Sequence, residues 1–453
     1  MLKSLHLENF KSWVSADLVF GKVTGLFGTN SSGKSSLTQF MLLLKQTKEA
    51  TDRGIALGLN GQYVNLGIFK DMIYGHSEES GLAWRLSFER EGELVLRPSM
   101  VGDPANPIRG RTLEVASTVR ESGKPRRMMS ADLEYAIGGV AFRLTRRNGS
   151  ETSFELTAEP AERFRFIRNP GRVWQLPGPL KSYAFPDQAR TYFQNASFLA
   201  DLEKAYEEQM DGVYYLGPLR EYPSRDYLWS RSRPVSVGVK GEETISAILA
   251  MTADGEQRNV GYKKHLRPFQ EIVAYWLAAL GVISDFKVEE IAEGSNRWQA
   301  RVVTRRGAPR VLLTDVGFGV SQVLPVVTLL QYVPRGSTVI LEQPEIHLHP
   351  LAQANLADVI INAAVHRDVQ VIVESHSEHL LLRLQRRIAE ATISGDDVAL
   401  YFCDITDSGS LLRRLQMDLW GKIENWPTNF MGDAFGEAAE TERARLSRII
   451  AAQ

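Results

Sequence analysis

The stretch that decides the fold of this chain is Gly28-Thr29-Asn30-Ser31-Ser32-Gly33-Lys34-Ser35. It follows residues 23–27, a short apolar run bounded by glycines. It leads into residues 35–46, where apolar side chains recur at helical spacing. A strand, a glycine-containing turn and a helix, in this order, are the context that a phosphate-binding loop requires. We therefore predict that residues 28–35, the P-loop, bind a nucleotide.

Each residue type in the P-loop has a chemical reason. Glycine at Gly28 and Gly33 lets the backbone turn sharply and bring its N–H groups against phosphate oxygens. Lys34 is expected to reach the β- and γ-phosphates, and the Ser35 hydroxyl is expected to ligate Mg²⁺. The positive end of the following helix attracts the same anion. The candidate phosphate-binding residues are Asn30, Ser31, Ser32, Gly33, Lys34, Ser35 and Ser36.

A second motif is an apolar run that ends in acidic residues, Val339-Ile340-Leu341-Glu342-Gln343-Pro344-Glu345. A carboxylate at the end of a buried strand can hold Mg²⁺, directly or through water, across from Ser35. The alternative is an apolar strand that happens to end in acidic residues. The presence of the P-loop in the same chain favours the Mg²⁺ interpretation.

Two further motifs follow the same logic. The first is a glycine-serine turn that leads into a helix, Asp315-Val316-Gly317-Phe318-Gly319-Val320-Ser321-Gln322. Its N–H groups can bind a phosphate, although an ordinary helix cap has the same sequence features. The second is Glu374-Ser375-His376-Ser377-Glu378-His379, at the end of a predicted strand over residues 369–373. A histidine at the carboxyl end of a parallel strand lies where such sheets bind ligands.

The rest of the chain shows an alternating pattern followed by a helix–strand pattern. Residues 84–158 read as short strands with hairpin turns at Glu91-Gly92, Gly138-Gly139 and Asn148-Gly149. Residues 187–210 and 263–280 each read as one helix. After a hairpin over residues 298–314, helices at 321–332, 351–364 and 379–391 alternate with strands at 338–341 and 369–373. This alternation predicts a largely parallel sheet.

Composition excludes several classes of protein. The 453 residues include 43% apolar and 24% charged side chains, as in a globular protein, and the formal net charge of −1 gives no argument for a nucleic-acid partner. One cysteine, Cys403, allows no intrachain disulfide, so we expect a reducing, cytoplasmic location. No segment approaches the ~20 apolar residues of a spanning helix, so we expect no membrane partner.

The four motifs, in this order and with a long insertion after the first, resemble the ABC-type ATPases of the SMC, RecF and OLD group. The resemblance implies an α/β fold: an ABC-type ATPase head with a mixed sheet, plus an inserted antiparallel β region and a helical segment. The expected parts are the N-terminal half of the head (1–85), a β-rich insertion (86–200), a helical lever region (201–285), the C-terminal half of the head (286–400) and a C-terminal extension (401–453).

The resemblance also implies roles for individual residues in binding and hydrolysing ATP. Leu7-Glu8-Asn9-Phe10-Lys11-Ser12 looks like the opening strand of that group, which places Lys11 and Ser12 beside the nucleotide. Gly317, Gly319, Ser321 and Gln322 would form a degenerate signature motif. Glu342 would be the Walker B acid that holds Mg²⁺ with Ser35. Glu345 would lie in the D-loop region, and His376 would be the switch histidine that senses the γ-phosphate.

More narrowly, several segments are similar to small stand-alone ATPases of bacterial anti-phage and toxin-type operons. In that family two heads enclose two ATP molecules, and each signature motif completes the site of the partner. The resemblance therefore implies a homodimer, or a higher homo-oligomer, that controls a separate effector such as a nuclease or toxin. The alternative is a RecF-like DNA-binding repair ATPase. The segments are Leu59-Asn60-Gly61 to Leu66-Gly67-Ile68-Phe69-Lys70-Asp71, Leu216-Gly217-Pro218-Leu219-Arg220, Gly238 to Gly241-Glu242, and Trp426-Pro427 to Asn429-Phe430.

Three departures from the family pattern matter. The usual Walker B acid and catalytic Glu are replaced by Glu342 and Gln343. An amide cannot act as a general base, so Glu345 or His376 polarises the water, or hydrolysis is slow. The insertion shows no long coiled coil. No Asp-x-Asp pair follows His376, so we do not expect a TOPRIM nuclease in this chain.

One region carries a local positive charge. Residues 109–183 contain 14 Lys or Arg against 8 Asp or Glu. Basic clusters include Lys124-Pro125-Arg126-Arg127 and Arg163-Phe164-Arg165-Phe166, and the second interleaves aromatic and basic side chains. They fit contact with a nucleic acid backbone or an acidic partner, or a plain solvated surface. Arg220 is expected either in an interdomain salt-bridge network or at the nucleotide, and the sequence leaves both open.

Overall fold

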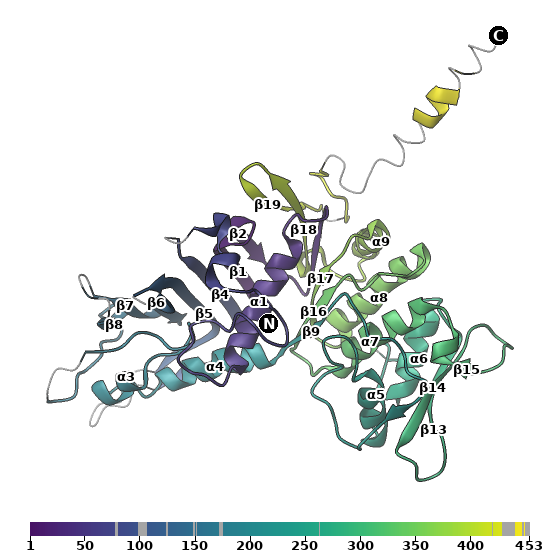
Figure 1. Ribbon diagram of the computed structural model, residues 1–453, viewed down its shortest axis with the longest axis horizontal. Coiled ribbons are helices and arrows are strands. Elements are labelled where there is room, and N and C mark those ends of the chain that lie inside the picture. The colour runs from purple at the N-terminus through teal and green to yellow at the C-terminus, as the bar shows by residue number, and fades with distance from the viewer. Residues whose placement is uncertain are drawn as a thin grey trace.

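The computed structural model describes residues 1–77, 80–97, 107–123, 126–147, 150, 152–171, 175–261, 263–418, 420–427, 440–445 and 448. The chain forms two lobes on either side of a central sheet (Figure 1). One lobe is built on an antiparallel sheet, and the other is mostly helical. The fold is therefore mixed α/β, which confirms the predicted fold class.

The central sheet has the strand order β19-β18-β3-β17-β16-β9. Five of its strands are parallel, and β19 is antiparallel to β18, so the sheet is mixed as predicted. Strand β18, which pairs with the strand that leads into the P-loop, and the edge strand β19 were not predicted from the sequence. The strands are β3 (Val23–Gly28), β9 (Val213–Leu216), β16 (Thr338–Glu342), β17 (Gln370–Glu374), β18 (Val398–Thr406) and β19 (Gly409–Arg414).

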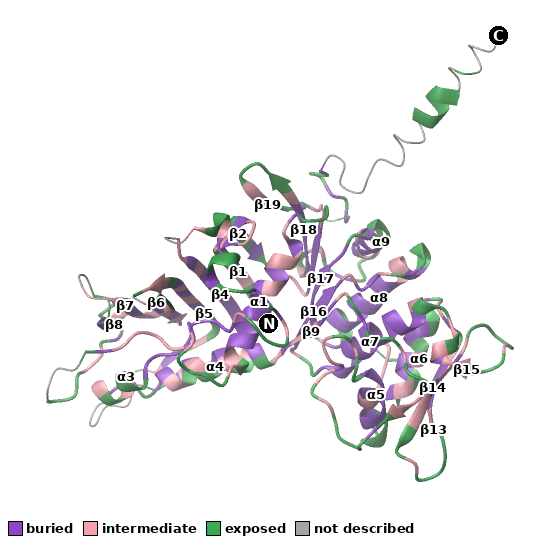
Figure 2. Cartoon of the chain, viewed as in Figure 1, coloured by how far each residue is buried: buried purple, intermediate pink, exposed green. Residues whose placement is uncertain are grey.

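Both faces of the central sheet are covered, and this explains the continuous apolar runs of its strands. Alternate residues of one strand enter different cores: Ile340 belongs to the core around α1 (Lys34–Glu49), whereas Val339 and Leu341 belong to the core of the helical lobe. Figure 2 shows α1 and the central strands as mostly buried. The P-loop helix therefore lies between the central sheet and the antiparallel sheet.

The antiparallel sheet has the order β2-β1-β4-β5-β6-β7-β8, which confirms the predicted inserted antiparallel region. Strands β1 and β2, from before the P-loop, continue the inserted strands into one seven-stranded sheet. The strands are β1 (Leu2–Phe10), β2 (Trp13–Val19), β4 (Leu82–Leu96), β5 (Ile108–Ser122), β6 (Arg127–Ile137), β7 (Val140–Arg146) and β8 (Phe154–Glu159).

The turn predictions in this sheet have three outcomes. Gly138 and Gly139 form the turn between β6 and β7, with φ of 56° and 76°, which confirms that hairpin. The hairpin predicted at Glu91-Gly92 is wrong, because both residues lie inside the long strand β4, where the pairing with β5 shifts register between Glu89 and Leu94. An irregularity in a strand and a hairpin turn share the same residue types. Asn148-Gly149 lies outside the described residues.

The single helix predicted over residues 187–210 is wrong. It is two helices, α3 (Asp187–Tyr192) and α4 (Leu199–Asp211), because the backbone of Phe193 is extended. Phe193 and Phe198 are buried in the lobe's core, and the Asn195 side chain bonds the backbone of Ile167 and Arg165. Tertiary packing of these side chains outweighs the local helical pattern.

The helical lobe contains α5 to α9 and a small four-stranded sheet, β10-β14-β13 with β15 on β14. The predicted hairpin over residues 298–314 is confirmed by the pairing of β14 with β15. The helices are α5 (Thr244–Ala253), α6 (Phe269–Ala279), α7 (Phe318–Tyr332), α8 (Pro350–His366) and α9 (Glu378–Ala389), and the strands are β10 (Tyr227–Leu228), β13 (Asp285–Glu290), β14 (Arg297–Val303) and β15 (Val311–Leu312).

The helix predicted over residues 263–280 begins later than expected. Helix α6 starts at Phe269, after Pro268, because Arg267 pairs with Arg258 in the short ribbon of β11 (Gln257–Arg258) and β12 (Arg267–Pro268). The short helices are α2 (Phe69–Met72), η1 (Tyr74–His76), η2 (Leu313–Asp315) and η3 (Gly395–Asp397). In the described part of the chain, no helix is both long and apolar enough to span a bilayer. The five-part division of the chain remains a prediction.

Candidate active site

The P-loop joins the end of β3 to the start of α1, and its two glycines are required by space and by backbone angle. Gly28 has φ of 143°, and a Cβ atom there would lie 2.1 Å from the carbonyl oxygen of Cys403. Gly33 has φ of 89°, and its Cβ would lie 2.6 Å from the hydroxyl oxygens of both Ser12 and Ser410. Only glycine adopts these conformations without displacing its neighbours.

The amino end of α1 is prepared for an anion. No side chain caps this 16-residue helix, and its first turn contains no acidic residue. Its first N–H groups and its dipole therefore point toward the loop without a competing carboxylate. The loop tip, Thr29 to Ser31, is exposed, while Ser32 is buried and donates to the carbonyl oxygen of Thr29. The N–H of Ser36 donates to Gly33, inside the first turn.

The side chain of Lys34 points back toward the start of the P-loop. Its Nζ donates to the carbonyl oxygens of Gly28 (3.0 Å) and Thr29 (2.5 Å). Burial lowers the pKa of Lys34, and the nearby Glu374 carboxylate partly offsets this effect. The ammonium group is thus held at the P-loop, where a phosphate would be its natural partner.

Three carboxylates gather opposite the P-loop: Glu342 and Glu374 at the ends of two neighbouring strands, and Glu345 in the turn after the first of them. We call them the carboxylate cluster. Glu342 and Glu374 are paired in register at the ends of β16 and β17. Thr38 donates to Glu342 Oε1 at 2.9 Å, and Ser35 donates to Glu374 Oε1 at 2.8 Å. Ser35 therefore contacts Glu374, which was not among the predicted site residues, and not the predicted Glu342.

Burial dominates the electrostatics of the cluster. It raises the pKa of Glu374 to about 7, and the negative charge of Glu342 adds to the shift. Burial also raises the pKa of Glu342 and of Glu345. The Oε2 atoms of Glu345 and Glu374 are buried and have no hydrogen-bond partner. Such a group of orphaned carboxylate oxygens favours a cation or a water network as its partner.

The residues fit Mg²⁺ bound together with a phosphate. Among the described residues, no three His, Cys, Asp or Glu side chains could hold a metal ion by themselves. Mg²⁺ in nucleotide sites binds one or two carboxylates and completes its shell with phosphate oxygens and water. Ser35, Glu342 and Glu374 supply hard oxygen donors of that kind, and two of them already share a hydrogen bond.

Glu345 and His376 are connected by the turn after β17. Ser375 Oγ and the backbone N–H of His376 both donate to Glu345 Oε1, at 2.7 and 2.8 Å. The exposed ring of His376 lies near Gly28 and Lys34. Partial burial and then the Lys34 charge lower the pKa of His376, so its imidazole is neutral at pH 7.

Gln343 directly follows β16 and has a strained backbone. Its φ is 45°, in the left-handed region that non-glycine residues rarely adopt. Its N–H donates to the carbonyl oxygen of Glu374 at 2.8 Å, which ties the end of β16 to β17. Backbone strain of this kind is often found at functional sites.

Lys11 and Ser12 lie at the edge of the P-loop. Lys11 Nζ donates to Gln39 on α1, and Ser12 accepts a hydrogen bond from Ser410 Oγ at 2.7 Å. The indole of Trp13 donates to the carbonyl oxygen of Gly33 at 3.0 Å. Ser410 belongs to β19, so the structure adds a C-terminal strand to the P-loop surroundings that the sequence did not indicate.

The signature-like residues Gly317, Gly319, Ser321 and Gln322 lie at the start of α7. This helix belongs to the core of the helical lobe, on the face of the central sheet opposite α1. Ser321 Oγ donates to the carbonyl oxygen of Phe318. A Cβ atom on Gly319 would lie 2.9 Å from the carbonyl oxygen of His347. These residues are thus placed beside the turn after Glu345, and not at the P-loop of the same chain.

The basic insertion uses its aromatic residues internally. Phe164 and Phe166 pack against Phe142 and Phe198, at distances of 5.2 to 6.3 Å between ring centres. The interleaved aromatics are therefore core residues and not an exposed stacking surface. The residues singled out at Lys124, Pro125, Asn429 and Phe430 lie outside the described part of the chain.

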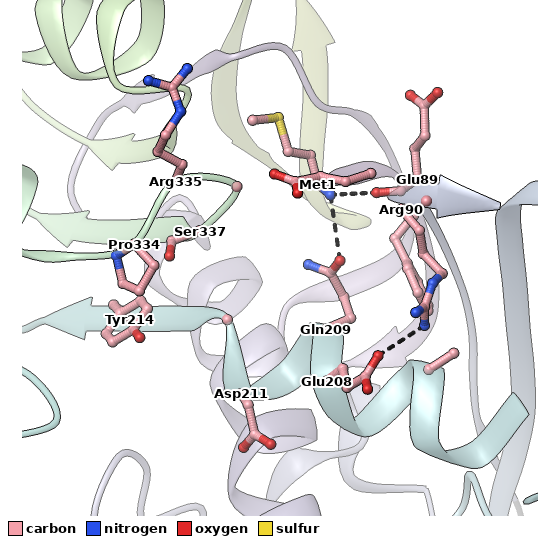
Figure 3. Close-up of a pocket in the computed structure, with 16 residues that line it drawn as sticks. Met1, Glu89, Arg90, Glu208, Gln209, Asp211, Tyr214, Pro334, Arg335 and Ser337 are labelled. Carbon is pink, nitrogen blue, oxygen red and sulfur yellow. Dashed lines mark hydrogen bonds and ion pairs between the residues drawn. The ribbon is translucent and has the colours of Figure 1, made fainter. Parts of the chain in front are cut away.

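A polar pocket of about 550 Å³ lies at the other end of the central sheet (Figure 3). The Met1 ammonium donates there to the carbonyl oxygen of Glu89, and Arg90 pairs with Glu208. Its walls include Tyr214 at the start of β9 and the residues before β16. Ligands of open α/β sheets bind at the carboxyl ends of the strands, so this pocket is not the nucleotide site.

The P-loop with its uncapped helix, and the acids at the ends of two neighbouring parallel strands, define a P-loop nucleotide-binding protein of the ABC type. A comparison with family models identifies a narrower family within this class. Residues 133–383, more than half of the chain, match the family model described as "AAA domain, putative AbiEii toxin, Type IV TA system". The chain belongs to this family, which confirms the resemblance to P-loop ATPases of toxin-type operons.

A second family model matches the C-terminal part of the chain. Residues 393–440, which include β18 and β19, match a family described as "Protein of unknown function (DUF3696)". The match of the AAA family covers the carboxylate cluster and α7 but not the P-loop. No curated protein matches the sequence.

Among solved structures, three SMC head domains are similar. One is bound to the C-winged helix domain of ScpA (12% identity, TM-score 0.47, 92% of this chain and 98% of that chain). One is from Thermotoga maritima (13%, 0.41, 92% and 99%). One is bound to the C-terminal domain of ScpA derived from Pyrococcus furiosus (10%, 0.44, 92% and 96%). At these TM-scores the likeness carries no argument about function.

Proposed function

We propose that this protein binds ATP with Mg²⁺ at the P-loop, hydrolyses it slowly, and uses the bound state as a switch for a separate effector. The single observation that carries the proposal is the P-loop geometry. An uncapped helix end, two glycines with positive φ and the Lys34 ammonium converge on one anion-binding site. Together they match the requirements of a triphosphate.

The residues divide the chemistry between them. Lys34 and the backbone of the P-loop bind the β- and γ-phosphates, and the neutral His376 lies beside Lys34, where it can sense the terminal phosphate. When bound, Mg²⁺ would be held by Ser35, Glu342 and Glu374 and would neutralise phosphate charge. Glu345 is the carboxylate near the site that is free to accept a proton from water, since Gln343 is an amide.

The experiment that tests this function is ATP binding by Lys34→Ala. Removing the ammonium takes away the charged partner of the phosphates. We expect at least a tenfold loss of ATP affinity, which corresponds to ~1.4 kcal/mol or more. Isothermal titration with a slowly hydrolysed ATP analogue and Mg²⁺ measures it.

The matched control is Lys204→Ala, because Lys204 is an exposed lysine of α4 whose side chain pairs only loosely with Glu208. It should bind ATP as the parent protein does. A folded Lys34→Ala protein that keeps its ATP affinity would contradict the proposed function. Circular dichroism and a thermal melt establish that both variants are folded.

To act as a switch, the protein would need to dimerise around ATP and to control an effector protein. We propose a homodimer in which the start of α7 of one copy completes the P-loop site of the other, because one chain places these two segments on opposite faces of the central sheet. The family's description as a toxin system supports a role in bacterial defence. A pull-down from the native host, with and without ATP, tests whether a nuclease, a toxin or another effector is retained.

A further inference from the structure

Arg220 is a buried cation beside the carboxylate cluster. It lies in the loop after β9 and is only 6% exposed. Its Nη2 donates to the backbone carbonyl oxygen of Glu342 at 3.3 Å. Its Nε and Nη1 groups are buried without a hydrogen-bond partner. The side chain thus reaches the site with two donors still available.

Such an arginine is costly for stability. Burial lowers the pKa of Arg220 to about 10, so the group is still charged at neutral pH. A buried N–H without a partner costs about 1–3 kcal/mol, and charged groups cost more. Several exposed arginines of this protein form ion pairs instead, as Arg233 does with Asp254. Arg220 is therefore better explained by a role in the site than by a role in folding.

The first contact of Arg220 holds one particular peptide. The carbonyl of the Glu342–Gln343 peptide accepts from Arg220, and its N–H donates to the carbonyl oxygen of Glu374. The next torsion is the strained φ of 45° at Gln343. A peptide held on both sides lets the chain keep this strained turn between Glu342 and Glu345.

The free donors of Arg220 have a free acceptor nearby. Glu345 Oε1 is occupied by Ser375 and the N–H of His376, whereas Oε2 has no partner. The charges of Arg220 and Glu345 interact, so the two groups face the same region. A donor and a carboxylate oxygen arranged in this way can hold one water molecule between them.

We propose that Arg220 is a positioning residue for ATP hydrolysis, which fixes the Glu342–Gln343 peptide and orders the attacking water against Glu345. This inference rests on the proposed function and adds a positioning residue for its hydrolysis step. In the reaction, the water oxygen bonds to the γ-phosphorus, and the bond to the β,γ-bridging oxygen breaks. A water proton passes to Glu345, and ADP and phosphate leave. Arg220 touches neither the nucleotide nor the breaking bond.

The test compares ATP binding with single-turnover hydrolysis in Arg220→Gln and Arg220→Lys. We expect the Kd for ATP to stay within about threefold of the parent value, because Lys34 and the P-loop are unchanged. We expect the single-turnover rate to fall by about 10- to 100-fold in Arg220→Gln, as when a positioned donor is removed from an active site. Arg220→Lys keeps the charge but has no planar fork, so its rate should lie between the two.

A chemical rescue separates positioning from packing. Arg220→Ala should regain activity several-fold in millimolar guanidinium chloride and not in the same concentration of sodium chloride. Arg233→Gln, from an exposed arginine that follows on the same long connection, is the matched control and should hydrolyse ATP at the parent rate. Thermal melts identify the folded variants, and Arg220→Gln and Arg220→Lys decide the question if the alanine variant does not fold.

Two results would overturn the inference. One is a single-turnover rate in Arg220→Gln equal to that of the parent. The other is a loss of rate fully explained by a loss of ATP affinity, which would make Arg220 a binding or structural residue. Neither result touches the proposed function, which fails instead if the parent protein does not bind ATP or if Lys34→Ala binds it normally.

Discussion

At the residue scale, the candidate site brings several ionisable side chains together in a buried position. Glu342, Glu345 and Glu374 are buried together, and the cations beside them are Lys34 and Arg220. Burial disfavours the ionised carboxylates, while Ser35, Thr38 and Ser375 hydroxyls and the two cations favour them. A site of this kind is costly in the free protein and is relieved when a cation joins the cluster.

A pH prediction follows from the raised pKa of Glu374. The pKa is about 7 in the folded protein and 4.5 in the ordinary carboxyl, so the folded state binds the proton more tightly. The cost of burying the ionised group is small near pH 4.5, grows as the pH rises, and is complete above about pH 7. Stability therefore decreases with rising pH across this window.

We expect Glu374→Gln, which removes the charge and keeps the shape, to stabilise the nucleotide-free protein more at pH 8 than at pH 5.5. The difference should be on the order of 2 kcal/mol, from the part of the shift that lies between these pH values. Thermal melts in EDTA at both pH values measure it. An equal effect of the substitution at the two pH values would contradict the assignment of this shift to Glu374.

At the element scale, the P-loop helix α1 is held at both ends. Its amino end carries the P-loop, and its carboxyl end is capped by Lys181 from the insertion, whose Nζ donates to the carbonyl oxygens of Lys48 and Ala50. Lys45 of α1 in turn donates to Met210 at the end of α4. Cations satisfy the free carbonyls and the negative dipole at helix ends.

We expect Lys181→Ala to lower the free energy of unfolding by about 1–2 kcal/mol, because it leaves two partly buried helix-end carbonyls without their donor. Chemical denaturation measures the loss. Lys204→Ala, on the exposed face of α4, is the matched control and should change stability by no more than about 0.5 kcal/mol. A Lys181→Ala protein as stable as this control would show that the cap is replaced by water.

At the scale of the whole molecule, the two lobes separate the two halves of the proposed composite site. The helix that follows the P-loop, α1, is packed in the core of the antiparallel lobe, whereas α7 is packed in the core of the helical lobe. Gly317 caps α7 with φ of −56°, and a side chain there would meet no atom within 4 Å. A larger residue at Gly317 can therefore block a partner without disturbing the fold.

We expect Gly317→Glu to abolish ATP-dependent dimerisation while each chain still binds ATP, because the new carboxylate would repel the partner's phosphates. Light scattering after size exclusion, with and without ATP, measures the oligomer. Mixing Gly317→Glu with Lys34→Ala should restore a dimer with one intact composite site. A Gly317→Glu protein that dimerises with ATP as the parent does would exclude this interface.

Much of the fold was predictable because its signals are local. The P-loop glycines, the apolar strand before them and the helix after them are neighbours in the chain, and the Gly138-Gly139 turn is set by its own backbone angles. Predictions failed where distant contacts act. Phe193 leaves the helix for the core, and Arg267 pairs with Arg258 before α6 begins.

By itself, the sequence determined the phosphate loop, the buried parallel strands and the acids that follow one of them, since residue type and short spacing fix these features. Only the tertiary structure decided which partners meet there. Glu374 bonds Ser35 because β17 pairs with β3, the strand that leads into the P-loop. Ser410 reaches Ser12 because β19 forms the edge of the same central sheet. Strand register and burial bring together residues that are hundreds of positions apart in the chain. Such contacts cannot be predicted from a local sequence pattern.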